Sequence, residues 1–374
     1  MTTGSKGKVI LVSFEFPPYI GGAGAVAQDY ATYLGQQGSV VVLTSTHKDR
    51  KKVDEDYEIH SVKSVRKIQP IFFYRKFSTI YDESVTHIIL NDAGACLMAA
   101  LFFSEALKSK SIVFVHGSED RKLLENQGLL FRLFKVRNRY LSLLRSCQLV
   151  IGVSEFLKGK FITKTRFPEL ANKFLVIRNS VNTEDIKCNH ARPAAFNDPS
   201  KTILFSASRL VERKGYGNML KLFREVIQID DGFVWYIAGD GPYEPILREK
   251  IDNYGLNRYV KLLGAIEKEA IWSYYGHADC FWQLSDFQEG LGLVYLEAAL
   301  CGCPVIGYNE GGIPEVVNNQ TGILFNRGES DAIIACLLSK SFKGLNREVV
   351  MHTAQSMNQE RKHLLLDKIG YKTH

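Results

Sequence analysis

The sequence predicts two α/β domains in series, each a doubly wound parallel sheet covered by helices on both faces. Three observations lead to this prediction. The chain has 374 residues, which exceeds the size at which a single hydrophobic core usually keeps growing. Short and almost uninterrupted apolar runs alternate with helical patterns, as in parallel sheets that are buried on both faces. A polar stretch over residues 186–200 interrupts the alternation, as expected of a linker.

The predicted first domain covers residues 1–185 and opens with a strand, a helix over 25–35 and a second strand, which together make a βαβ unit. Its apolar runs are 8–13, 40–44, 87–90, 111–116, 149–154 and 174–180. After the linker, a second domain over 201–345 repeats the pattern, with runs at 202–208, 233–239, 261–266, 278–284, 304–308 and 322–325. The tail, 346–374, is polar, and whether it crosses back to the first domain is left open.

The composition is that of an ordinary folded protein, with 45% hydrophobic and 23% charged residues. No apolar run is long enough to span a bilayer, and the start does not resemble a signal peptide. The seven cysteines are odd in number and scattered, so we expect reduced thiols in a cytoplasmic protein. Cys301 and Cys303 lack neighbouring histidines or a second cysteine pair, which disfavours a metal site.

A glycine loop, Gly21, Gly22 and Gly24, lies between the first strand and the first helix. Glycines there let backbone amides approach an anion at a helix N-terminus. Gly22, Gly24 and Ala27 match the dinucleotide fingerprint, but the loop before them is too long, and residues 44–46 contain no acid to hold a ribose. We therefore favour a phosphate- or acceptor-facing loop over an NAD site, with simple packing as the alternative.

In the second domain, Arg209 and Lys214 follow the strand at 202–208. Two cations at a strand end beside a glycine suit a diphosphate, although ordinary surface charge is the alternative. Gly239 and Gly241 flank the turn after the next strand. Ala265 and Ile266 end a further strand with little bulk, and could leave backbone groups free to contact a nucleotide base.

The most informative segment is 286–298. Glu289 lies in a glycine-flanked turn, and a helix should begin near Leu293, so that its free amides and positive dipole end face a bound anion. Glu297 lies just inside that helix. Carboxylates are strong acceptors for sugar hydroxyls, so one glutamate could hold a sugar and the other a ribose. The alternative is a solvated glutamate pair on an ordinary helix.

The segment EGLGLVYLEAALCGCPVIGYNEGGIPEVV resembles the E-x7-E signature of the retaining GT-B glycosyltransferases, specifically the GT4 family. The resemblance extends to SRLVERKG, AGDGP, the glycine loop and IRNSVNTE (177–184), and covers most of residues 9–328. It implies a GT-B fold, in which two Rossmann-like domains face a central cleft. The second domain then binds the nucleotide-sugar donor and the first meets the acceptor.

The resemblance also assigns residues. Glu289 would contact the transferred sugar, Glu297 the ribose, and Arg209 and Lys214 the diphosphate, while His116 would line the sugar site. Ser154 and Asn179 match polar positions facing the cleft, although Asn179 is followed by serine where the family usually has glycine. The remaining implied donor-binding residues are Gly21, Gly22, Gly24, Gly239, Gly241, Ala265, Ile266, Gly290, Leu291, Gly292, Leu293 and Val294.

By the same resemblance, the reaction retains anomeric configuration and needs no metal or cofactor beyond a UDP- or GDP-sugar. Asp54-Glu55-Asp56 has the D-x-D pattern of another glycosyltransferase fold. It lies in a charged run with no strand directly before it, so we interpret it as a solvated loop. Two alternatives stay open: a nucleotide-sugar epimerase or hydrolase on the same fold, and a catalytically silent nucleotide-sugar-binding protein.

Residues 121–145 are rich in lysine and arginine and also carry Leu129, Leu130, Leu133, Phe134 and Leu141. We predict a basic amphipathic helix that can lie on an anionic bilayer, with packing against its own domain as the alternative. No nucleic-acid-binding motif accompanies it. We therefore expect a cytoplasmic enzyme, peripheral on the inner face of the plasma membrane, with a glycan or lipid-linked acceptor.

Overall fold

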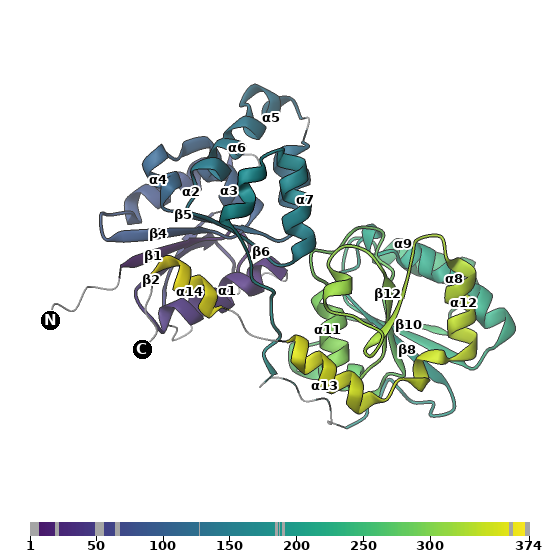
Figure 1. Cartoon of the computed structure of the whole chain (residues 1–374). Coiled ribbons are helices and arrows are strands. Elements are labelled where there is room, and N and C mark those ends of the chain that lie inside the picture. The colour runs from purple at the N-terminus through teal and green to yellow at the C-terminus, as the bar shows by residue number, and fades with distance from the viewer. Residues whose placement is uncertain are drawn as a thin grey trace. The chain divides into compact units, whose positions relative to one another are not determined.

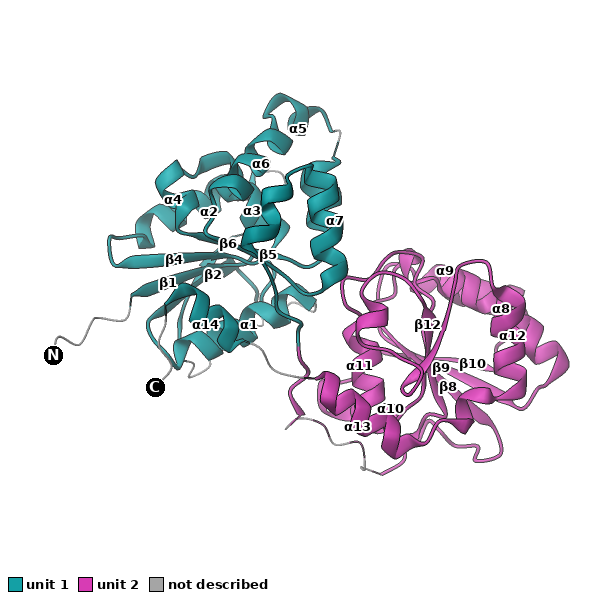
Figure 2. Ribbon diagram, in the orientation of Figure 1, with its two compact units in different colours: residues 1–179, 360–374 teal, residues 180–359 magenta. Residues whose placement is uncertain are grey.

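The computed structural model describes residues 7–18, 22–48, 56–63, 68–126, 128–183, 186, 188, 191–358 and 362–370. The chain divides into two compact units, coloured separately in Figure 2. Unit 1 comprises residues 1–179 and 360–374, and unit 2 comprises residues 180–359. The division therefore falls before the predicted domain boundary at 185, and the predicted linker belongs to unit 2.

Unit 1 is built on seven strands: β1 (Lys8–Val12), β2 (Val40–Ser45), β3 (Glu58–Val62), β4 (Val85–Leu90), β5 (Ser111–Val115), β6 (Leu149–Gly152) and β7 (Phe174–Val176). They form one sheet in the order β3-β2-β1-β4-β5-β6-β7, and every neighbouring pair is parallel. The chain winds from β1 to one edge and then from β4 to the other, so the predicted doubly wound topology is confirmed.

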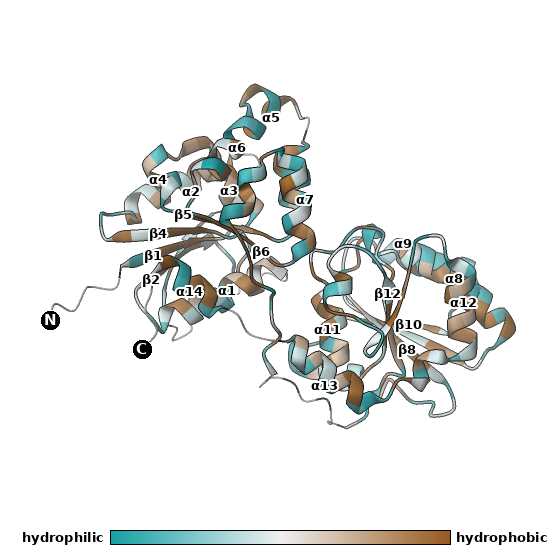
Figure 3. Cartoon of the chain, in the orientation of Figure 1, coloured by the Kyte–Doolittle hydropathy of each residue, from teal (hydrophilic) through white to brown (hydrophobic). Residues whose placement is uncertain are grey.

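The helices of unit 1 are α1 (Gly22–Gly35), α2 (Gln69–Ile80), α3 (Ala93–Phe102), α4 (Glu105–Ser109), α5 (Leu129–Leu133), α6 (Val136–Ser146), α7 (Glu155–Thr165) and α14 (His363–Ile369), with the helical turns η1 (Asp120–Leu124) and η2 (Pro168–Lys173). Figure 1 shows α1 and α14 on one face of the sheet and α2, α3 and α4 on the other. The central strands are brown in Figure 3, the colour of apolar residues. This is the pattern of a sheet covered on both faces.

The sequence analysis missed strand β3. Of its five residues only Val62 is fully buried, and Glu58 and Ser61 are exposed. The strand pairs with β2 at the edge of the sheet. Edge strands tolerate polar residues, which discourage pairing with other chains, and this composition hides the strand from a search for apolar runs.

The single amphipathic helix predicted over residues 121–145 is wrong. The stretch forms three short pieces instead, η1, α5 and α6. Lys135, between α5 and α6, has φ of 49°, a left-handed conformation that ends one helix before the next begins. Leu141, predicted on the membrane-facing side, is buried in unit 1. Helix α5, by contrast, has no buried residue.

Unit 2 is built on six strands: β8 (Thr202–Ala207), β9 (Phe233–Ala238), β10 (Val260–Gly264), β11 (Cys280–Trp282), β12 (Val305–Tyr308) and β13 (Gly322–Phe325). Their order is β10-β9-β8-β11-β12-β13, again with parallel pairs throughout. All six were predicted from the sequence. They read as apolar runs because both faces of the sheet are covered.

The helices of unit 2 are α8 (Tyr216–Ile229), α9 (Glu244–Asn253), α10 (Lys268–His277), α11 (Leu293–Leu300), α12 (Ser330–Ser339) and α13 (Arg347–Met357), with the helical turns η4 (Glu212–Lys214), η5 (Ile313–Glu315) and η6 (Ser341–Gly344). Figure 2 shows α8, α9 and α12 on one face of the sheet and α10, α11 and α13 on the other. The core includes Trp235 and Trp282, whose ring centroids are 4.8 Å apart.

The C-terminal tail is shared between the two units. Helix α13 belongs to unit 2, where the Arg347 guanidinium donates to the carbonyls of Ala278 and Gly276 at 2.8 and 2.7 Å. Helix α14 belongs to unit 1, and its Leu365 and Leu366 are fully buried in the core that contains β1 and α1. The question left open by the sequence is thus answered by a return of the chain to unit 1.

Candidate active site

In a doubly wound sheet, ligands bind beyond the carboxyl ends of the strands, at the point where the strand order reverses. This point lies between β1 and β4 in unit 1 and between β8 and β11 in unit 2. In unit 2, the loops that follow β8 and β11 contain Arg209, Lys214 and Glu289. Each unit therefore has one edge at which a ligand is expected to bind.

Glu289 lies in the loop between β11 and α11 and is only 9% exposed. Its Oε1 accepts hydrogen bonds from Lys214 Nζ at 2.7 Å and from Ser285 Oγ at 2.8 Å. A buried carboxylate is costly unless it is paired and hydrogen-bonded, and Lys214, itself largely buried, supplies the opposite charge. Two of the predicted catalytic residues are therefore in direct contact.

Arg209 follows β8 in the loop that Lys214 ends. Its side chain is exposed, and among the described residues its guanidinium has no hydrogen-bond or ion-pair partner. Arg213 and Lys214 lie over the ring of Phe287, at 4.6 and 5.4 Å from its centroid. Among the described residues, the loop thus presents Arg209 without a partner, Arg213 over an aromatic ring, and Lys214 paired with Glu289.

Two glycines with positive φ shape this edge of unit 2. At Gly215 (φ 77°) a Cβ would lie 1.9 Å from the carbonyl oxygen of Leu284, so the Lys214 loop can pack directly against the β11 loop. Gly292 (φ 85°) is the N-cap of α11. The amides of Leu293 and Val294 therefore lie in the first turn of α11, where helices leave their N–H groups without intrahelical partners. Gly290 and Leu291 complete the turn between Glu289 and this helix end.

The other predicted donor-binding residues of unit 2 follow β9 and β10. The Leu210 amide donates to the carbonyl of Asp240 at 2.6 Å, which joins the Gly239–Gly241 turn to the Arg209 loop. The Gly239 amide donates to Gly264 at 2.7 Å, at the end of β10. Ala265, which comes next, is exposed, and Ile266 is half-buried. The loops after β8, β9 and β10 therefore form one continuous edge.

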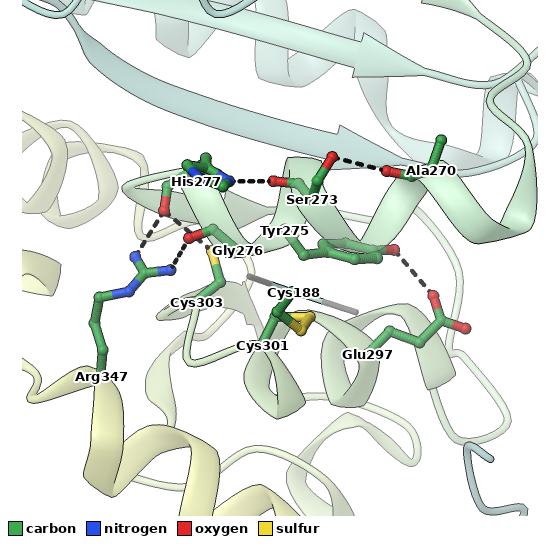
Figure 4. The surroundings of a disulfide bond; sticks show 11 residues. Cys188, Ala270, Ser273, Tyr275, Gly276, His277, Glu297, Cys301, Cys303 and Arg347 are labelled. Carbon is green, nitrogen blue, oxygen red and sulfur yellow. Dashed lines mark hydrogen bonds between the residues drawn. A yellow bond between two sulfur atoms is a disulfide. The ribbon is translucent and has the colours of Figure 1, made fainter. Parts of the chain in front are cut away.

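Glu297 lies inside α11 in a different environment from that of Glu289. Burial raises the pKa of its carboxyl above the ordinary 4.5, while a hydrogen bond from the Tyr275 hydroxyl and the charge of Lys268 act in the opposite direction. The Tyr275 hydroxyl lies 3.0 Å from Glu297 Oε2 (Figure 4). Among the described residues, the Glu297 carboxylate therefore has a hydrogen-bond donor but no ion-pair partner within contact distance.

The expectation of seven reduced thiols is wrong for two of them. Cys188 and Cys301 form a disulfide, with Cα atoms 5.4 Å apart. Cys301 is the C-cap of α11, about one turn beyond Glu297, so the bond ties the predicted linker to this helix (Figure 4). The two cysteines are 113 residues apart in sequence, and such pairings cannot be deduced from spacing. The free cysteines are Cys96, Cys147, Cys280, Cys303 and Cys336, all buried. Cysteine usage thus no longer argues for a reducing compartment.

In unit 1, His116 follows β5 and is half-buried. Its Nε2 lies 3.2 Å from Asn91 Oδ1. Gly22 and Gly24 begin α1, and a Cβ at Gly24 would approach the backbone of Glu15 and Phe16 to 3.3 Å, so this glycine has a packing role. Gly21 lies outside the described residues.

Ser154 and Asn179 follow β6 and β7, towards the edge of the unit 1 sheet. Ser154 is fully buried, and its Oγ accepts a hydrogen bond from the Leu157 amide at 3.2 Å as the N-cap of α7. Asn179 is half-buried and is the last residue of this part of unit 1. The Ser154 hydroxyl therefore has a structural use of its own.

Sequence reasoning missed several residues that hold the site loops. In unit 1 these are Asn91 and Glu119. Oε2 of Glu119 accepts hydrogen bonds from three consecutive backbone amides, those of His116, Gly117 and Ser118, at 3.0, 2.9 and 3.0 Å. In unit 2, the Arg327 guanidinium forms an ion pair with Glu310, with Nε 2.8 Å from Oε1, and donates a hydrogen bond to the Ser285 carbonyl at 3.0 Å. Asn91 carried a usable signal, because it is the first polar residue after the apolar run of β4.

Within the part of the chain that the structure describes, no group of three His, Cys, Asp or Glu residues could hold a metal ion. Of the D-x-D sequence, Asp54 and Glu55 lie outside the described residues, and Asp56 is exposed. None of the described helices is long and apolar enough to cross a bilayer.

Two family models match the chain in succession. The model described as Glycosyltransferase Family 4 matches residues 20–185, and the one described as Glycosyl transferases group 1 matches residues 189–339. With two doubly wound parallel units, these matches define a glycosyltransferase with a GT-B fold. Within that class, the chain is a GT4-type glycosyltransferase.

Known proteins resemble the chain over most of its length. It is 28% identical to a GDP-mannose-dependent monoacylated alpha-(1-6)-phosphatidylinositol monomannoside mannosyltransferase of Corynebacterium glutamicum, over 88% of each chain. It is 26% identical to an alpha-monoglucosyldiacylglycerol synthase of Streptococcus pneumoniae, over 89% of this chain and 78% of the other. Anabaena HepE in complex with UDP-glucose has a TM-score of 0.74 at 19% identity, over 97% of this chain and 100% of that one. At such identity the structural similarity shows the fold.

Proposed function

We propose that this protein transfers a hexose, with retention of anomeric configuration, from a nucleotide-diphosphate donor to a lipid-linked or glycan acceptor. The observation that carries the proposal is the buried Lys214–Glu289 pair at the switch point of the unit 2 sheet. The pair lies beside the N-terminus of α11, with the unpaired Arg209 on the same loop as Lys214. Cations, a helix N-terminus and an acceptor carboxylate are the groups that a sugar diphosphate needs.

The chemistry requires charge stabilisation more than proton transfer by the protein. Departure of the leaving group builds negative charge on the diphosphate and positive charge on the sugar. Arg209, Lys214 and the amides of Leu293 and Val294 address the first charge through preorganised electrostatics. Glu289 holds the sugar, and the leaving phosphate assists deprotonation of the acceptor by front-face displacement. No step in this scheme uses a metal ion, and the anomeric configuration of the product tests retention.

Unit 2 is proposed to bind a GDP- or UDP-sugar, with Glu297 accepting from the ribose hydroxyls. The names of the relatives support a nucleotide-sugar donor: one is GDP-mannose-dependent, and HepE was solved with UDP-glucose. Glu297 is suited to the ribose because its buried carboxylate accepts one hydrogen bond from the described part of the chain, that of Tyr275, and has acceptor capacity to spare.

A thermal-shift panel of UDP-, GDP- and ADP-sugars tests this donor site. A ligand at about 100 times its Kd adds about 2.7 kcal/mol to the stability of the folded state. We expect one base to raise the unfolding midpoint and Glu297→Ala to reduce that shift. The readout can be tryptophan fluorescence, because Trp235, Trp272 and Trp282 all lie in unit 2. A panel in which no nucleotide sugar raises the midpoint would contradict the proposal.

The acceptor is proposed to lie at an anionic membrane, which α5 contacts. Leu129, Leu130, Leu133 and Phe134 are exposed at 81%, 53%, 69% and 51%. Arg132, Lys135, Arg137 and Arg139 are exposed around them. An exposed apolar cluster bordered by cations fits a bilayer of anionic lipids, which offers both hydrocarbon and negative charge. Two relatives support this acceptor class by their names: one is a phosphatidylinositol monomannoside mannosyltransferase, and the other is a synthase of alpha-monoglucosyldiacylglycerol. A cytoplasmic location at the inner face of the membrane follows as part of the same proposal.

A further inference from the structure

Asn91 occupies the switch point of the unit 1 sheet. It is the residue directly after β4, and its backbone amide donates to the Val12 carbonyl of the neighbouring strand β1 at 3.0 Å. Its side chain is 1% exposed. A buried side-chain amide must satisfy two donors and an acceptor, and in this protein each is used on a different element.

The orientation of the Asn91 amide is fixed by one of these contacts. Nδ2 donates to the backbone carbonyl of Ala23, in the first turn of α1, at 2.9 Å. A carbonyl can only accept, so the amide cannot be flipped without losing this bond. Nδ2 also donates to Ser13 Oγ, at the end of β1, at 2.9 Å. Oδ1 is therefore the atom that faces His116.

This orientation decides which nitrogen of the His116 ring carries a proton. Oδ1 of Asn91 can only accept, so His116 Nε2, 3.2 Å away, carries the proton. In a neutral imidazole the proton on one nitrogen leaves the other as an acceptor. Nδ1 is then the ring atom available to a substrate hydroxyl.

The backbone of His116 is held independently of Asn91. The buried Glu119 carboxylate accepts from three consecutive amides, those of His116, Gly117 and Ser118. The loop after β5 thus keeps its conformation through Glu119, while Asn91 acts on the side chain of His116. A change at Asn91 can consequently alter the ring without removing what fixes the loop.

We infer that Asn91 is a positioning residue of the transfer reaction. It holds His116 as the Nε2–H tautomer, with Nδ1 presented as an acceptor for a substrate hydroxyl, and it ties that ring to Ala23 in the first turn of α1. The inference deepens the proposed function, because it rests on a substrate-contacting role for His116. The competing explanation is that Asn91 only satisfies buried polar groups and acts on the fold.

A double-mutant cycle in the full-length protein separates the two explanations. Asn91→Ala should lower kcat/KM about 10- to 100-fold, mainly through kcat, as expected when a reacting group is misplaced. In a His116→Ala background the same change should cost less than about threefold, because residues that act as a unit are non-additive. An equal loss from Asn91→Ala in both backgrounds would overturn the inference.

Ring nitrogen spectra of ¹⁵N-histidine-labelled protein provide a second readout that does not depend on activity. At alkaline pH, where imidazoles are neutral, the His116 signals, assigned with His116→Ala, should show the Nε2–H tautomer. They should lose this preference in Asn91→Ala. A wild-type ring protonated at Nδ1 would refute the inference. If instead His116→Ala leaves turnover unchanged while the tautomer depends on Asn91, the role of His116 in the proposed function fails, and Asn91 is shown to control a ring that the reaction does not use.

Discussion

Glu289 and Glu297 are two carboxylates in one unit whose surroundings differ in charge. Glu289 accepts hydrogen bonds from Lys214 and Ser285, and Lys214 brings a positive charge into contact with it. Among the described residues, Glu297 has only the Tyr275 hydroxyl at hydrogen-bond distance, and burial raises the pKa of its carboxyl. The protein therefore bears a cost for keeping Glu297 ionised at neutral pH, which makes sense if hydroxyl donors from a ligand complete its environment.

At the residue scale, we predict that Glu297→Gln stabilises the protein at neutral pH while weakening nucleotide binding. Burial gives the Glu297 carboxyl a higher pKa in the folded protein than in the unfolded chain. The folded protein therefore loses stability as the pH rises from about 4.5, the ordinary pKa of the group, through the raised pKa. Removing the charge should therefore raise Tm at pH 7.5 and change it little at pH 4. Functional residues commonly show this trade-off.

The control is Glu289→Gln, which removes the negative partner of Lys214 and should lower Tm at pH 7.5. Thermal unfolding of the three proteins at both pH values, followed by calorimetric titration with the nucleotide, makes the comparison. A Glu297→Gln effect of equal size at pH 4 and pH 7.5 would show that the charge is not its cause.

At the scale of single elements, α5 and α11 illustrate how short helices are specialised. Helix α5 contributes nothing to the core of unit 1, so its apolar side chains require another explanation than stability. Helix α11 starts at the N-terminal cap Gly292, carries Glu297, and ends at a cysteine that is tied to residue 188. Its two ends are thus fixed by different devices, a loop turn and a covalent bond.

For α5 we predict that the double variant Leu129→Ser and Leu133→Ser no longer floats with phosphatidylglycerol-containing vesicles. Burying one leucine side chain is worth about 1.5–3 kcal/mol, so losing two should reduce partitioning by more than about tenfold. Ile229→Ser is the matched control, because Ile229 is 71% exposed on α8 in unit 2 and should leave flotation unchanged. Equal flotation of the double variant and wild type would remove α5 from the membrane contact.

For α11 we predict that reduction of the Cys188–Cys301 disulfide lowers the free energy of unfolding of unit 2 by about 2–4 kcal/mol, the usual contribution of a native disulfide. Urea unfolding followed by tryptophan fluorescence, with and without dithiothreitol, measures the difference. The reductant should have no further effect on Cys188→Ser. A wild-type protein whose midpoint is insensitive to dithiothreitol would contradict the stabilising role.

Across the two units, each has its own core, and α14 shows that unit 1 is not contiguous in sequence. Leu365 and Leu366 are fully buried in unit 1 although they follow unit 2 along the chain. Unit 1 is therefore complete only after the last helix has been made. Separate cores allow each unit to be destabilised by itself.

We predict that Leu366→Ala destabilises unit 1 by about 2–5 kcal/mol, the usual cost of such a core truncation, with a smaller effect on unit 2. Leu337→Ala, at a fully buried position on α12 of unit 2, is the matched variant. In denaturant unfolding, far-UV circular dichroism should show a first transition at a lower denaturant concentration for Leu366→Ala. The unfolding midpoint followed by tryptophan fluorescence should change mainly for Leu337→Ala. Identical shifts of both signals in both variants would show that the two units unfold as one.

The strands could be predicted from the sequence wherever both faces of the sheet are buried, because such strands are continuous apolar runs. Twelve apolar runs were enough to predict every strand that the structure describes except β3, whose edge position allows polar residues. The family resemblance assigned both Lys214 and Glu289 to the donor site, but neither their direct contact nor their burial as a pair was predicted. The disulfide, the clamp by Glu119 and the role of Asn91 depend on contacts between distant segments, which no local pattern records.

We propose that unit 2 binds a nucleotide sugar and that the transferred sugar contacts Glu289. The sugar-transfer activity of the Glu289→Gln variant tests this proposal most directly. Product formation and nucleotide affinity are measured on the same sample, with the donor found by the thermal-shift panel. We expect turnover to fall about 100- to 1,000-fold, as when one preorganised contact to the reacting group is lost, while nucleotide affinity changes by less than about threefold. Turnover close to that of the wild type would show that Glu289 does not hold the transferred sugar.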